Sequence, residues 1–339
     1  MAKPLYIGSF PPPYGGVTVK NALLFESLSE KVPLEKLNLV DAKKGNMQAV
    51  CMLAKALLAR EGSLAIGISP QSYLQVTRFM HRVNRGKMGR SILFVMGGRV
   101  PENEADVLKL GCYRRVYVET ESMKDRFETM GAKNVSVYPN CRKRPVAPCS
   151  VRPSIDGKVK CVYFSLISEQ KGARLVLDVA RNSPEMEFHF YGRIDQAFEA
   201  HFMSEVSDLA NVQYHGVFDS ASGDVVAELN AYDIHLFPTM CPNEGVPGVI
   251  VETKIAAVPT VASGRGYNGE LVEDGVDGLL TREDSADELS GIVKALAKDP
   301  RRLDCMKKAA LASAERFYID SYLEPICSEL LRGRQAEDS

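Results

Sequence analysis

The sequence predicts an α/β protein with two Rossmann-like domains that face a central cleft. In the first half, short apolar runs alternate with amphipathic stretches of helical period, a pattern typical of βαβ units and parallel sheets. A proline-rich segment then interrupts the pattern, and a second alternating set follows it. The length of 339 residues suits two domains. Ligands of such sheets bind beyond the carboxyl ends of the strands, so we expect the binding site in the cleft.

The first domain is expected to span residues 1–145. The opening strand is predicted at Leu5–Gly8, followed by a Pro/Gly loop and a helix over Val17–Leu28. Helices are expected in the intervals between the later strands. The later strands are predicted at Leu64–Ile68, Ser91–Val95, Arg115–Val118 and Val135–Tyr138. Residues 146–157 are expected to form the linker, since this stretch is rich in proline and lacks apolar periodicity.

The second domain is expected over residues 158–317, and a C-terminal helix over 318–339 is expected to pack back on the first domain. From about Asp284 only helices are predicted, with a break at Asp299-Pro300. The strands of this domain are predicted at Lys160–Phe164, Glu187–Tyr191, Val212–Tyr214, Ile234–Phe237, Thr260–Ala262 and Gly278–Leu280.

Composition excludes several classes of protein. The chain is 45% hydrophobic and 25% charged, which is ordinary for a globular protein and excludes a fibre or a disordered chain. No apolar run approaches the roughly 20 residues that span a bilayer. The opening segment lacks a secretory pattern, so we expect a cytoplasmic protein whose eight cysteines are reduced. The spacing of histidines, cysteines and acids predicts no metal site.

The formal net charge of −1 conceals an asymmetry between the halves. Residues 1–150 carry a formal charge of +11 and the remainder −12. The densest basic segment contains His81, Arg82, Arg85, Lys87 and Arg90. Such a half is suited to an anionic partner such as a membrane surface, although a solvated basic face without a partner explains the charge equally well.

Two segments have the residue types of a phosphate site. Gly15 and Gly16 stand between the first strand and a helix, where glycines let backbone N–H groups approach a phosphate. A plain turn explains two glycines as well. The pattern is neither GxGxxG, which disfavours a dehydrogenase, nor a Walker A loop. Lys171 precedes Gly172 at a strand-to-helix turn and could neutralise a diphosphate, but a solvated lysine at a helix start is the commoner case.

The segment after Ile234–Phe237 is the most informative. Glu244 lies in a Gly/Pro loop, a helix is predicted to start near Pro247, and Glu252 lies within that helix. A carboxylate can accept hydrogen bonds from vicinal hydroxyls of a sugar, and the free amides at the helix start can meet phosphate or sugar oxygens. A glutamate that bonds a neighbouring loop would have the same spacing.

These residues resemble a known family. NEGVPGVIVE, AAVPTVAS and NGELVEDGVDGLL are similar to the ExGxPxxxxE region of retaining GT-B glycosyltransferases of family 4, the glycosyl transferases group 1. The Gly15-Gly16 loop, VSVYPN at 135–140, Lys171-Gly172, the strand end at Tyr191-Gly192 and the stretch at 212–218 follow in the family's order. The resemblance covers essentially the whole chain and is more specific in the C-terminal half.

The resemblance implies a role for each matching residue. Glu252 would hold the ribose hydroxyls, Glu244 would lie beside the transferred sugar, and Lys171 would contact the diphosphate. Glu244 and Lys171 would be the catalytic residues, and neither a metal nor a cofactor is implied. The remaining donor-binding positions would be Gly15, Gly16, Gly192, Arg193, Gly245, Val246, Pro247, Gly248 and Val249.

Two positions depart from the family. Leu166 occupies the place of a usual arginine, and Met96 lies near the place of a usual histidine. Arg193, Arg99 or Arg265 could replace the missing cation on the leaving diphosphate. These departures put the rate of reaction in doubt, not the fold.

The function implied is retaining transfer of a sugar from a nucleotide-diphosphate sugar, a UDP-sugar first, to a lipid-linked or polysaccharide glycan. We expect contact with the inner face of a membrane through the basic half, and we expect no nucleic-acid partner. Two alternatives stay open: a partner subunit that kept the fold but lost chemistry, and a GT-B nucleotide-sugar epimerase.

Overall fold

A computed structural model describes residues 3–12, 15–147, 149–153, 158–219, 223–242 and 244–335. The chain divides into two compact units. Unit 1 comprises Met1–Arg144 and Phe317–Ser339, and unit 2 comprises Pro145–Arg316. Of the expected linker, residues 148 and 154–157 lie outside the described residues. Residues 13 and 14 of the expected glycine loop also lie outside them.

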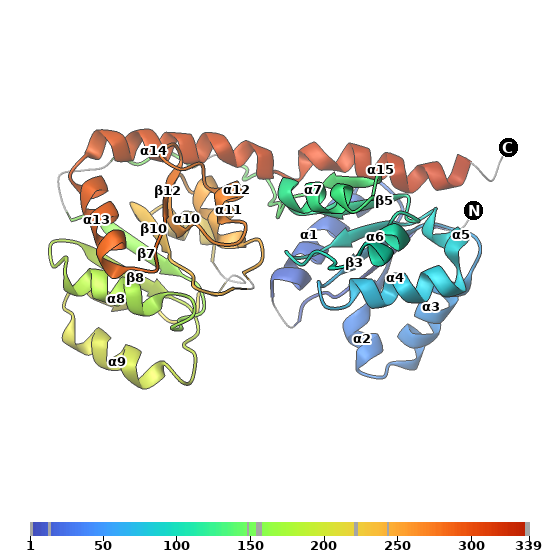
Figure 1. The fold of residues 1–339 in the computed structure, drawn as a ribbon, viewed down its shortest axis with the longest axis horizontal. Helices are drawn as coiled ribbons and strands as arrows, with labels where there is room; N and C mark the ends of the chain where they lie inside the picture. The colour runs from blue at the N-terminus through green and yellow to red at the C-terminus, as the bar shows by residue number, and fades with distance from the viewer. Residues whose placement is uncertain are drawn as a thin grey trace. The chain divides into compact units, whose positions relative to one another are not determined.

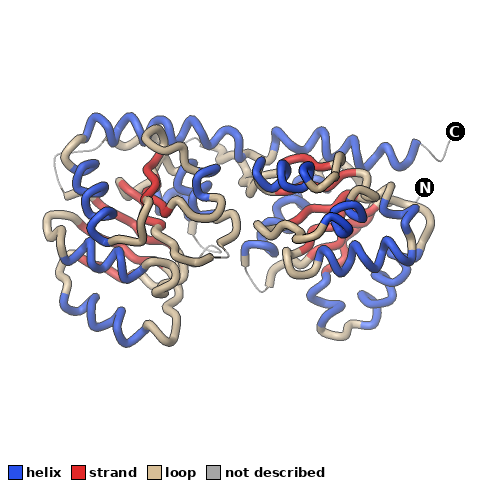
Figure 2. The backbone as a smooth tube through the Cα atoms, viewed as in Figure 1, coloured by secondary structure: helices blue, strands red, loops and turns tan. Residues whose placement is uncertain are grey.

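Unit 1 contains a six-stranded parallel sheet in the order β2-β1-β3-β4-β5-β6. Its strands are β1 (Leu5–Gly8), β2 (Glu35–Asn38), β3 (Leu64–Ile68), β4 (Ile92–Val95), β5 (Arg115–Val118) and β6 (Val135–Val137). Helices flank the strands, as Figure 2 shows. The helices in the chain before residue 144 are α1 (Gly16–Ser29), α2 (Leu39–Lys43), α3 (Met47–Leu58), α4 (Tyr73–Val83), α5 (Arg85–Met88), α6 (Glu104–Leu110) and α7 (Glu121–Thr129).

The C-terminal helix α15 (Asp320–Gln335) belongs to unit 1. Its apolar residues, among them Leu323 and Ile326, share one core with Leu24 of α1 and with Tyr6 and Phe94 of the sheet. The hydroxyl of Ser63 donates a 3.2 Å hydrogen bond to the carbonyl of Leu330. The last helix of the chain therefore covers the same sheet face as the first helix.

Strand β2 differs from the sequence expectation, which placed only helices between residues 29 and 63. Glu35 and Lys36 are exposed, and only Leu37 of this strand is buried. A four-residue strand at the edge of a sheet buries too little apolar surface to show the continuous hydrophobic run of a central strand.

Unit 2 contains a second six-stranded parallel sheet in the order β12-β11-β10-β7-β8-β9. Strands β7, β8, β10 and β12 of this sheet are labelled in Figure 1. Its strands are β7 (Lys160–Phe164), β8 (Glu187–Tyr191), β9 (Val212–Tyr214), β10 (Ile234–Phe237), β11 (Thr260–Ser263) and β12 (Gly278–Thr281). All six predicted strands are confirmed, with β11 and β12 each one residue longer. The predicted fold class, two Rossmann-like α/β sheets, is confirmed as well.

Two layers of helices enclose this sheet. On one face, Tyr163 and Phe190 pack with Leu177 of α8, Phe202 of α9 and Val293 of α13. The opposite face carries Val162 and Tyr191 and is covered by residues of α10 and the end of α11. The helices are α8 (Ala173–Arg181), α9 (Glu199–Asp208), α10 (Val225–Leu229), α11 (Gly248–Ile255), α12 (Asn268–Leu271), α13 (Ala286–Ala297) and α14 (Pro300–Ser313). A 3₁₀ helix, η1 (Ala314–Phe317), follows α14.

The strand order of unit 2 reverses between β7 and β10. β7 comes first in the chain and pairs β8, its successor, on one side, whereas β10 and the strands after it lie on the other side. The loops that leave β7 and β10 therefore diverge at this point, and ligands of parallel sheets bind at such a reversal. The candidate residues of unit 2 lie on these two loops and their neighbours.

Candidate functional site

The loop from β7 to α8 is fixed by buried contacts. The Tyr163 hydroxyl donates hydrogen bonds to the carbonyls of Leu166 at 2.7 Å and Lys171 at 3.2 Å. The Lys171 amide donates to Ser168 Oγ at 3.2 Å. Burial raises the pKa of Tyr163 well above its usual range, so the hydroxyl stays a donor. The backbone at Lys171 is thus fixed by the buried Tyr163 hydroxyl and by Ser168.

Gly172 allows this loop to approach the end of β10 closely. It has φ +78° and forms the N-cap of α8, a left-handed conformation that favours glycine. A Cβ at this position would lie 2.0 Å from the carbonyl oxygen of Pro238. The Met240 amide also donates to the carbonyl of Gln170 at 2.8 Å. The two loops therefore touch through their backbones at the point where the strand order reverses.

Lys171 and Glu244 form an ion pair across these loops. Both side chains are largely withdrawn from solvent, with exposed fractions of 21% and 10%. Thr239, which follows β10, donates a 2.8 Å hydrogen bond to the same Glu244 oxygen, Oε2, that bonds the Lys171 ammonium. The structure thus brings together the two residues expected to be catalytic.

Thr239 was not anticipated from the sequence. Its side chain is fully buried, and its hydroxyl also accepts from the Cys241 amide at 3.3 Å. Its carbonyl accepts from Ser263 Oγ at 2.7 Å, and the Ser263 carbonyl accepts from Asn268 Nδ2 at 3.0 Å. A polar residue two positions after the end of a buried strand was the available signal, since parallel sheets place their functional side chains beyond the carboxyl ends of the strands.

Glu252 lies on α11, the helix that directly follows the Glu244 loop, and is half-buried. The helix starts at Gly248 after Pro247, as the sequence predicts. Gly245 is half-buried and Val246 and Pro247 are buried, which brings the loop to the helix start. Gly248 and Val249 form the first turn, where the helix supplies no intrahelical partners for backbone N–H groups.

Gly192 and Arg193 end β8 beside the β7 loop. Gly192 has φ +141°, and a Cβ there would lie 1.8 Å from the Ser165 carbonyl oxygen. The Arg193 carbonyl accepts from the Ile167 amide at 2.9 Å, so the Arg193 backbone runs alongside the position of Leu166. The Arg193 side chain is exposed and makes no ion pair within the described part of the chain.

Gly15 and Gly16 belong to unit 1, at the start of α1. Both are exposed, and a Cβ at either position would meet nothing within 4 Å. The Gly15 amide donates to Thr18 Oγ1 at 3.0 Å, and the Thr18 hydroxyl donates to the Gly15 carbonyl at 3.0 Å. These contacts fix the first turn of α1. Met96, at the end of β4, is buried in the core of unit 1.

Two other candidate arginines already have acidic partners. Arg99 in unit 1 is paired with Glu102 at 3.7 Å. Arg265 in unit 2 meets Asp284 through both Nε, at 3.1 Å from Oδ1, and a terminal nitrogen. Hydrogen bonding to Asp284 raises the pKa of Arg265. Arg193 is therefore the candidate nearest to Leu166 whose charge is not compensated by an acid in the described residues.

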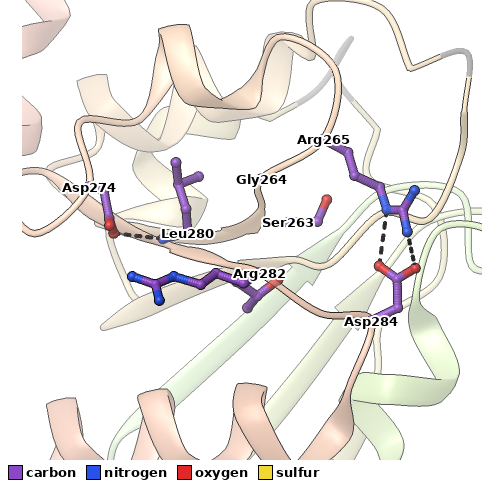
Figure 3. A pocket seen from close by; sticks show the side chains of 8 residues that line it. Ser263, Gly264, Arg265, Asp274, Leu280, Arg282 and Asp284 are labelled. Carbon is purple, nitrogen blue, oxygen red and sulfur yellow. Dashed lines mark hydrogen bonds and ion pairs between the residues drawn. The ribbon is translucent and has the colours of Figure 1, made fainter.

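The Arg265–Asp284 pair borders a pocket of about 460 Å³, drawn in Figure 3. The pocket lies between the loop after β11 and the two ends of β12, and Ser263 and Arg282 also line it. Ser263 joins this pocket to the Thr239–Glu244 contact through its bond to the Thr239 carbonyl. Within the described residues, no group of three or more His, Cys, Asp or Glu side chains is placed to hold a metal ion.

Comparison with known proteins identifies the fold and a family match for unit 2. Residues 158–299 match the family model of the glycosyl transferases group 1. No curated protein matches the sequence. Among solved structures, HepE (Alr3699) of Anabaena in complex with UDP superposes with a TM-score of 0.70 at 17% identity, covering 97% of this chain and 99% of that one.

Other solved structures show the same architecture. The lipopolysaccharide outer core galactosyltransferase WaaB, in its apo form, gives a TM-score of 0.68 at 14% identity over 99% of this chain and 100% of its own. TarM gives 0.63 at 16% identity over 84% of this chain and 58% of its own. Together these findings show that the chain has the GT-B fold and that residues 158–299 of unit 2 match the glycosyl transferases group 1.

Proposed function

We propose that the protein transfers a sugar, with retention of anomeric configuration, from a UDP-sugar to a glycan acceptor. The observation that carries the proposal is the contact of Lys171 with Glu244 at the reversal of strand order in unit 2. A lysine and a carboxylate at this point match the two charges of a sugar diphosphate site: a cation for the phosphates and an acceptor for sugar hydroxyls.

In this proposal Lys171 stabilises the leaving diphosphate. When the anomeric carbon–oxygen bond breaks, negative charge grows on the β-phosphate, and the Lys171 ammonium stabilises it. The Tyr163 and Ser168 contacts fix the Lys171 backbone from which this side chain extends. Glu244 neutralises Lys171 in the ligand-free protein and turns to the sugar hydroxyls once the diphosphate takes its place.

Arg193 supplies the second cation in place of the family's usual arginine. The hydrogen bond from Ile167 to the Arg193 carbonyl sets its backbone beside Leu166, and its side chain is exposed. A guanidinium that starts from the neighbouring strand can therefore serve the same phosphates. Glu252 holds the ribose hydroxyls, and the amides of the Gly245–Val249 segment meet the donor's oxygens.

The acceptor hydroxyl attacks from the face that the diphosphate leaves, and a phosphate oxygen takes its proton. The new bond joins the acceptor oxygen to the anomeric carbon, and UDP departs. No protein nucleophile is needed, so the single carboxylate Glu244 beside Lys171 suffices.

The donor base is supported by structural relatives. HepE of Anabaena has been solved with UDP and with UDP-glucose. WaaB is a lipopolysaccharide galactosyltransferase. On this basis we propose UDP as the nucleotide and a lipid-linked or polysaccharide glycan as the acceptor, with peripheral contact at the inner face of the membrane through the basic N-terminal half.

The test is calorimetric titration of UDP, GDP, ADP and NADH into the wild type and Glu252→Ala. We expect UDP to bind the wild type. Glu252→Ala should weaken the affinity for UDP by about tenfold or more, since the ribose hydroxyls lose the charged carboxylate that accepts their hydrogen bonds. Glu199→Ala, an exposed glutamate in the first turn of α9, is the matched control and should bind UDP as the wild type does.

Preference for GDP or ADP would keep the enzyme class and change the donor. Binding of no nucleotide by a folded wild type would contradict the proposal and favour a partner subunit without chemistry. With UDP bound, a screen of UDP-sugars followed by NMR of the product's anomeric proton tests retention.

A further inference from the structure

Helix α3 of unit 1 turns an apolar stripe towards solvent. Met47, Val50 and Leu58 are 69%, 38% and 57% exposed, and Cys51 is exposed as well. With exposed Ala54 they occupy positions 47, 50, 51, 54 and 58, a spacing that places them on one side of the helix. Eleven residues separate the first from the last, so the stripe is about 16 Å long.

The other side of α3 is apolar too. Its residues towards the protein, such as Met52, Leu53 and Leu57, are only partly covered, and none of the helix's residues is buried. A surface helix normally carries charged or polar residues on its outer side. An outer side that is apolar instead marks a surface that another apolar phase covers.

The end of α4 is joined to the end of α3 and also carries exposed apolar side chains. Phe79 and Val83 are 49% and 44% exposed. The Asn84 side chain donates to the carbonyls of Leu57 at 3.0 Å and Ala59 at 3.1 Å, which joins the end of α4 to the end of α3. We refer to the exposed side chains of Met47, Val50, Leu58, Phe79 and Val83 as the α3–α4 face.

The chain around this face is strongly basic. Residues 36–90 contain ten Lys and Arg against two acids, Asp41 and Glu61. Lys55 on α3 and Arg82 and Arg85 beside the end of α4 are exposed and make no ion pair within the described residues. This excess exists in a chain whose formal net charge is −1, so it is local and not a property of the whole protein.

We propose that the α3–α4 face docks the protein on an anionic lipid bilayer, with the apolar stripe inserted into the interface and the basic side chains on the headgroups. Apolar residues beside Lys and Arg are the two features that hold a helix in the interfacial plane. A second copy of this chain is the poorer occupant, because the same basic residues would face each other across the contact.

The helices that form the face are suited to lying on a membrane. α3 has 12 residues, too few to cross a bilayer. Among the described residues, no helix combines the length and hydropathy that a membrane span requires. The inference rests on the expectation of membrane contact and extends it to a particular face, and it stands without the assignment of the donor site.

The absence of tryptophan from the sequence gives a direct test. Phe79→Trp introduces a single tryptophan into the face, and Met203→Trp introduces one at an exposed position on α9 of unit 2. On addition of phosphatidylcholine vesicles containing one-third phosphatidylglycerol, we expect the emission of Phe79→Trp to shift to the blue and to be quenched by brominated lipid. The emission of Met203→Trp should not change.

Two sets of substitutions separate the apolar and the ionic contributions in vesicle flotation. The triple variant Lys55→Gln, Arg82→Gln and Arg85→Gln should lower the partition coefficient by about a hundredfold at low salt. The triple variant Met47→Ser, Leu58→Ser and Phe79→Ser should lower it by about tenfold or more, also at high salt. The matched control is Arg301→Gln, Arg302→Gln and Lys308→Gln on α14, whose exposed cations lie in unit 2.

A wild type that does not float with anionic vesicles, or that floats equally well after either triple substitution, would overturn the proposal. It would also be overturned if light scattering without lipid showed a dimer that the Met47, Leu58 and Phe79 substitutions dissociate. Unchanged circular dichroism and unchanged UDP affinity of the variants separate loss of docking from misfolding and from loss of the donor site.

Discussion

Glu244 Oε2 receives two hydrogen bonds, one from the Lys171 ammonium and one from Thr239 Oγ1 at 2.8 Å. The carboxylate is thus held between the loop that leaves β7 and the strand end of β10. The Thr239 side chain is fully buried, so the surrounding residues hold its hydroxyl in place. The Lys171 ammonium is at the end of a long side chain with several rotatable bonds. In the proposed mechanism we therefore expect Thr239 to position Glu244 both before and after a diphosphate replaces it on Lys171.

We expect Thr239→Val to lower kcat by about tenfold, because Glu244 loses the hydrogen bond that fixes it. Valine preserves the size and burial of the side chain at position 239. Thr239→Ser retains the hydroxyl and should restore most of the activity. The KM for the donor should change less than kcat. Initial rates with a saturating UDP-sugar measure this. Equal activity of Thr239→Val and Thr239→Ser would show that the hydroxyl does not position Glu244.

Lys171→Ala should reduce kcat by about 10²–10³-fold, since it removes a cation that faces charge developing on the leaving group. Lys171→Arg retains the charge but not the reach and should recover only part of the rate. Lys298→Ala, an exposed lysine after α13, is the control. A Lys171→Ala enzyme that turns over normally would remove this lysine from the mechanism.

Comparing Gly172→Ala with Gly216→Ala separates two costs of an added Cβ: the strain of a left-handed backbone conformation and a clash with a neighbouring loop. The two glycines have nearly equal φ, +78° and +77°, but a Cβ at Gly216 meets nothing within 4 Å, whereas one at Gly172 lies 2.0 Å from the Pro238 carbonyl oxygen. Gly216→Ala should cost about 1–2 kcal/mol of unfolding free energy. Gly172→Ala should cost clearly more and should also weaken UDP binding, because the Lys171 loop must move. Urea unfolding measures both, and equal losses would argue against the close approach.

His235 makes the stability of unit 2 depend on pH. It is fully buried on β10, its Nδ1 lies 3.1 Å from Thr260 Oγ1, and burial lowers its pKa from 6.5 to about 3. Between these values the unfolded chain binds a proton that the folded protein excludes. Stability should therefore be lost as the pH falls from about 6.5 towards 3, at up to about 1.4 kcal/mol per pH unit.

Urea unfolding at a series of pH values tests this. His235→Leu should flatten the dependence in that range, although the variant also leaves the Thr260 hydroxyl without its His235 contact. A slope identical in wild type and His235→Leu would mean that other groups cause the acid sensitivity.

The sequence was sufficient for the strands that carry the site. The six strands of unit 2 are short apolar runs bounded by Gly, Pro and polar residues, so periodicity locates them within a residue. Edge strand β2 was not predicted from the sequence, because the exposed, charged residues Glu35 and Lys36 stand where a central strand has apolar residues. Strands can therefore be predicted from the sequence wherever burial requires apolar residues.

The pairing of distant side chains was not readable in that way. Glu244 and Lys171 stood out as motif residues, but their contact requires β7 and β10 to be neighbours, which follows from the order of the strands in the sheet. Thr239 had no motif to mark it, because a threonine after a strand gains its role only from the carboxylate that the fold places 2.8 Å away.

The sequence by itself determined the α/β class, nearly every strand, the residue types of a phosphate and sugar site, and the basic half of the chain. Hydrophobic periodicity and residue chemistry are local properties, and they act before any distant contact forms. Only the tertiary structure decided which loops meet, that Arg193 starts beside Leu166 while Arg265 is bound to Asp284, and that the apolar stripe of α3 faces solvent. Those facts depend on which strands pair and on which side chains the packing covers, and these are set by the whole chain at once.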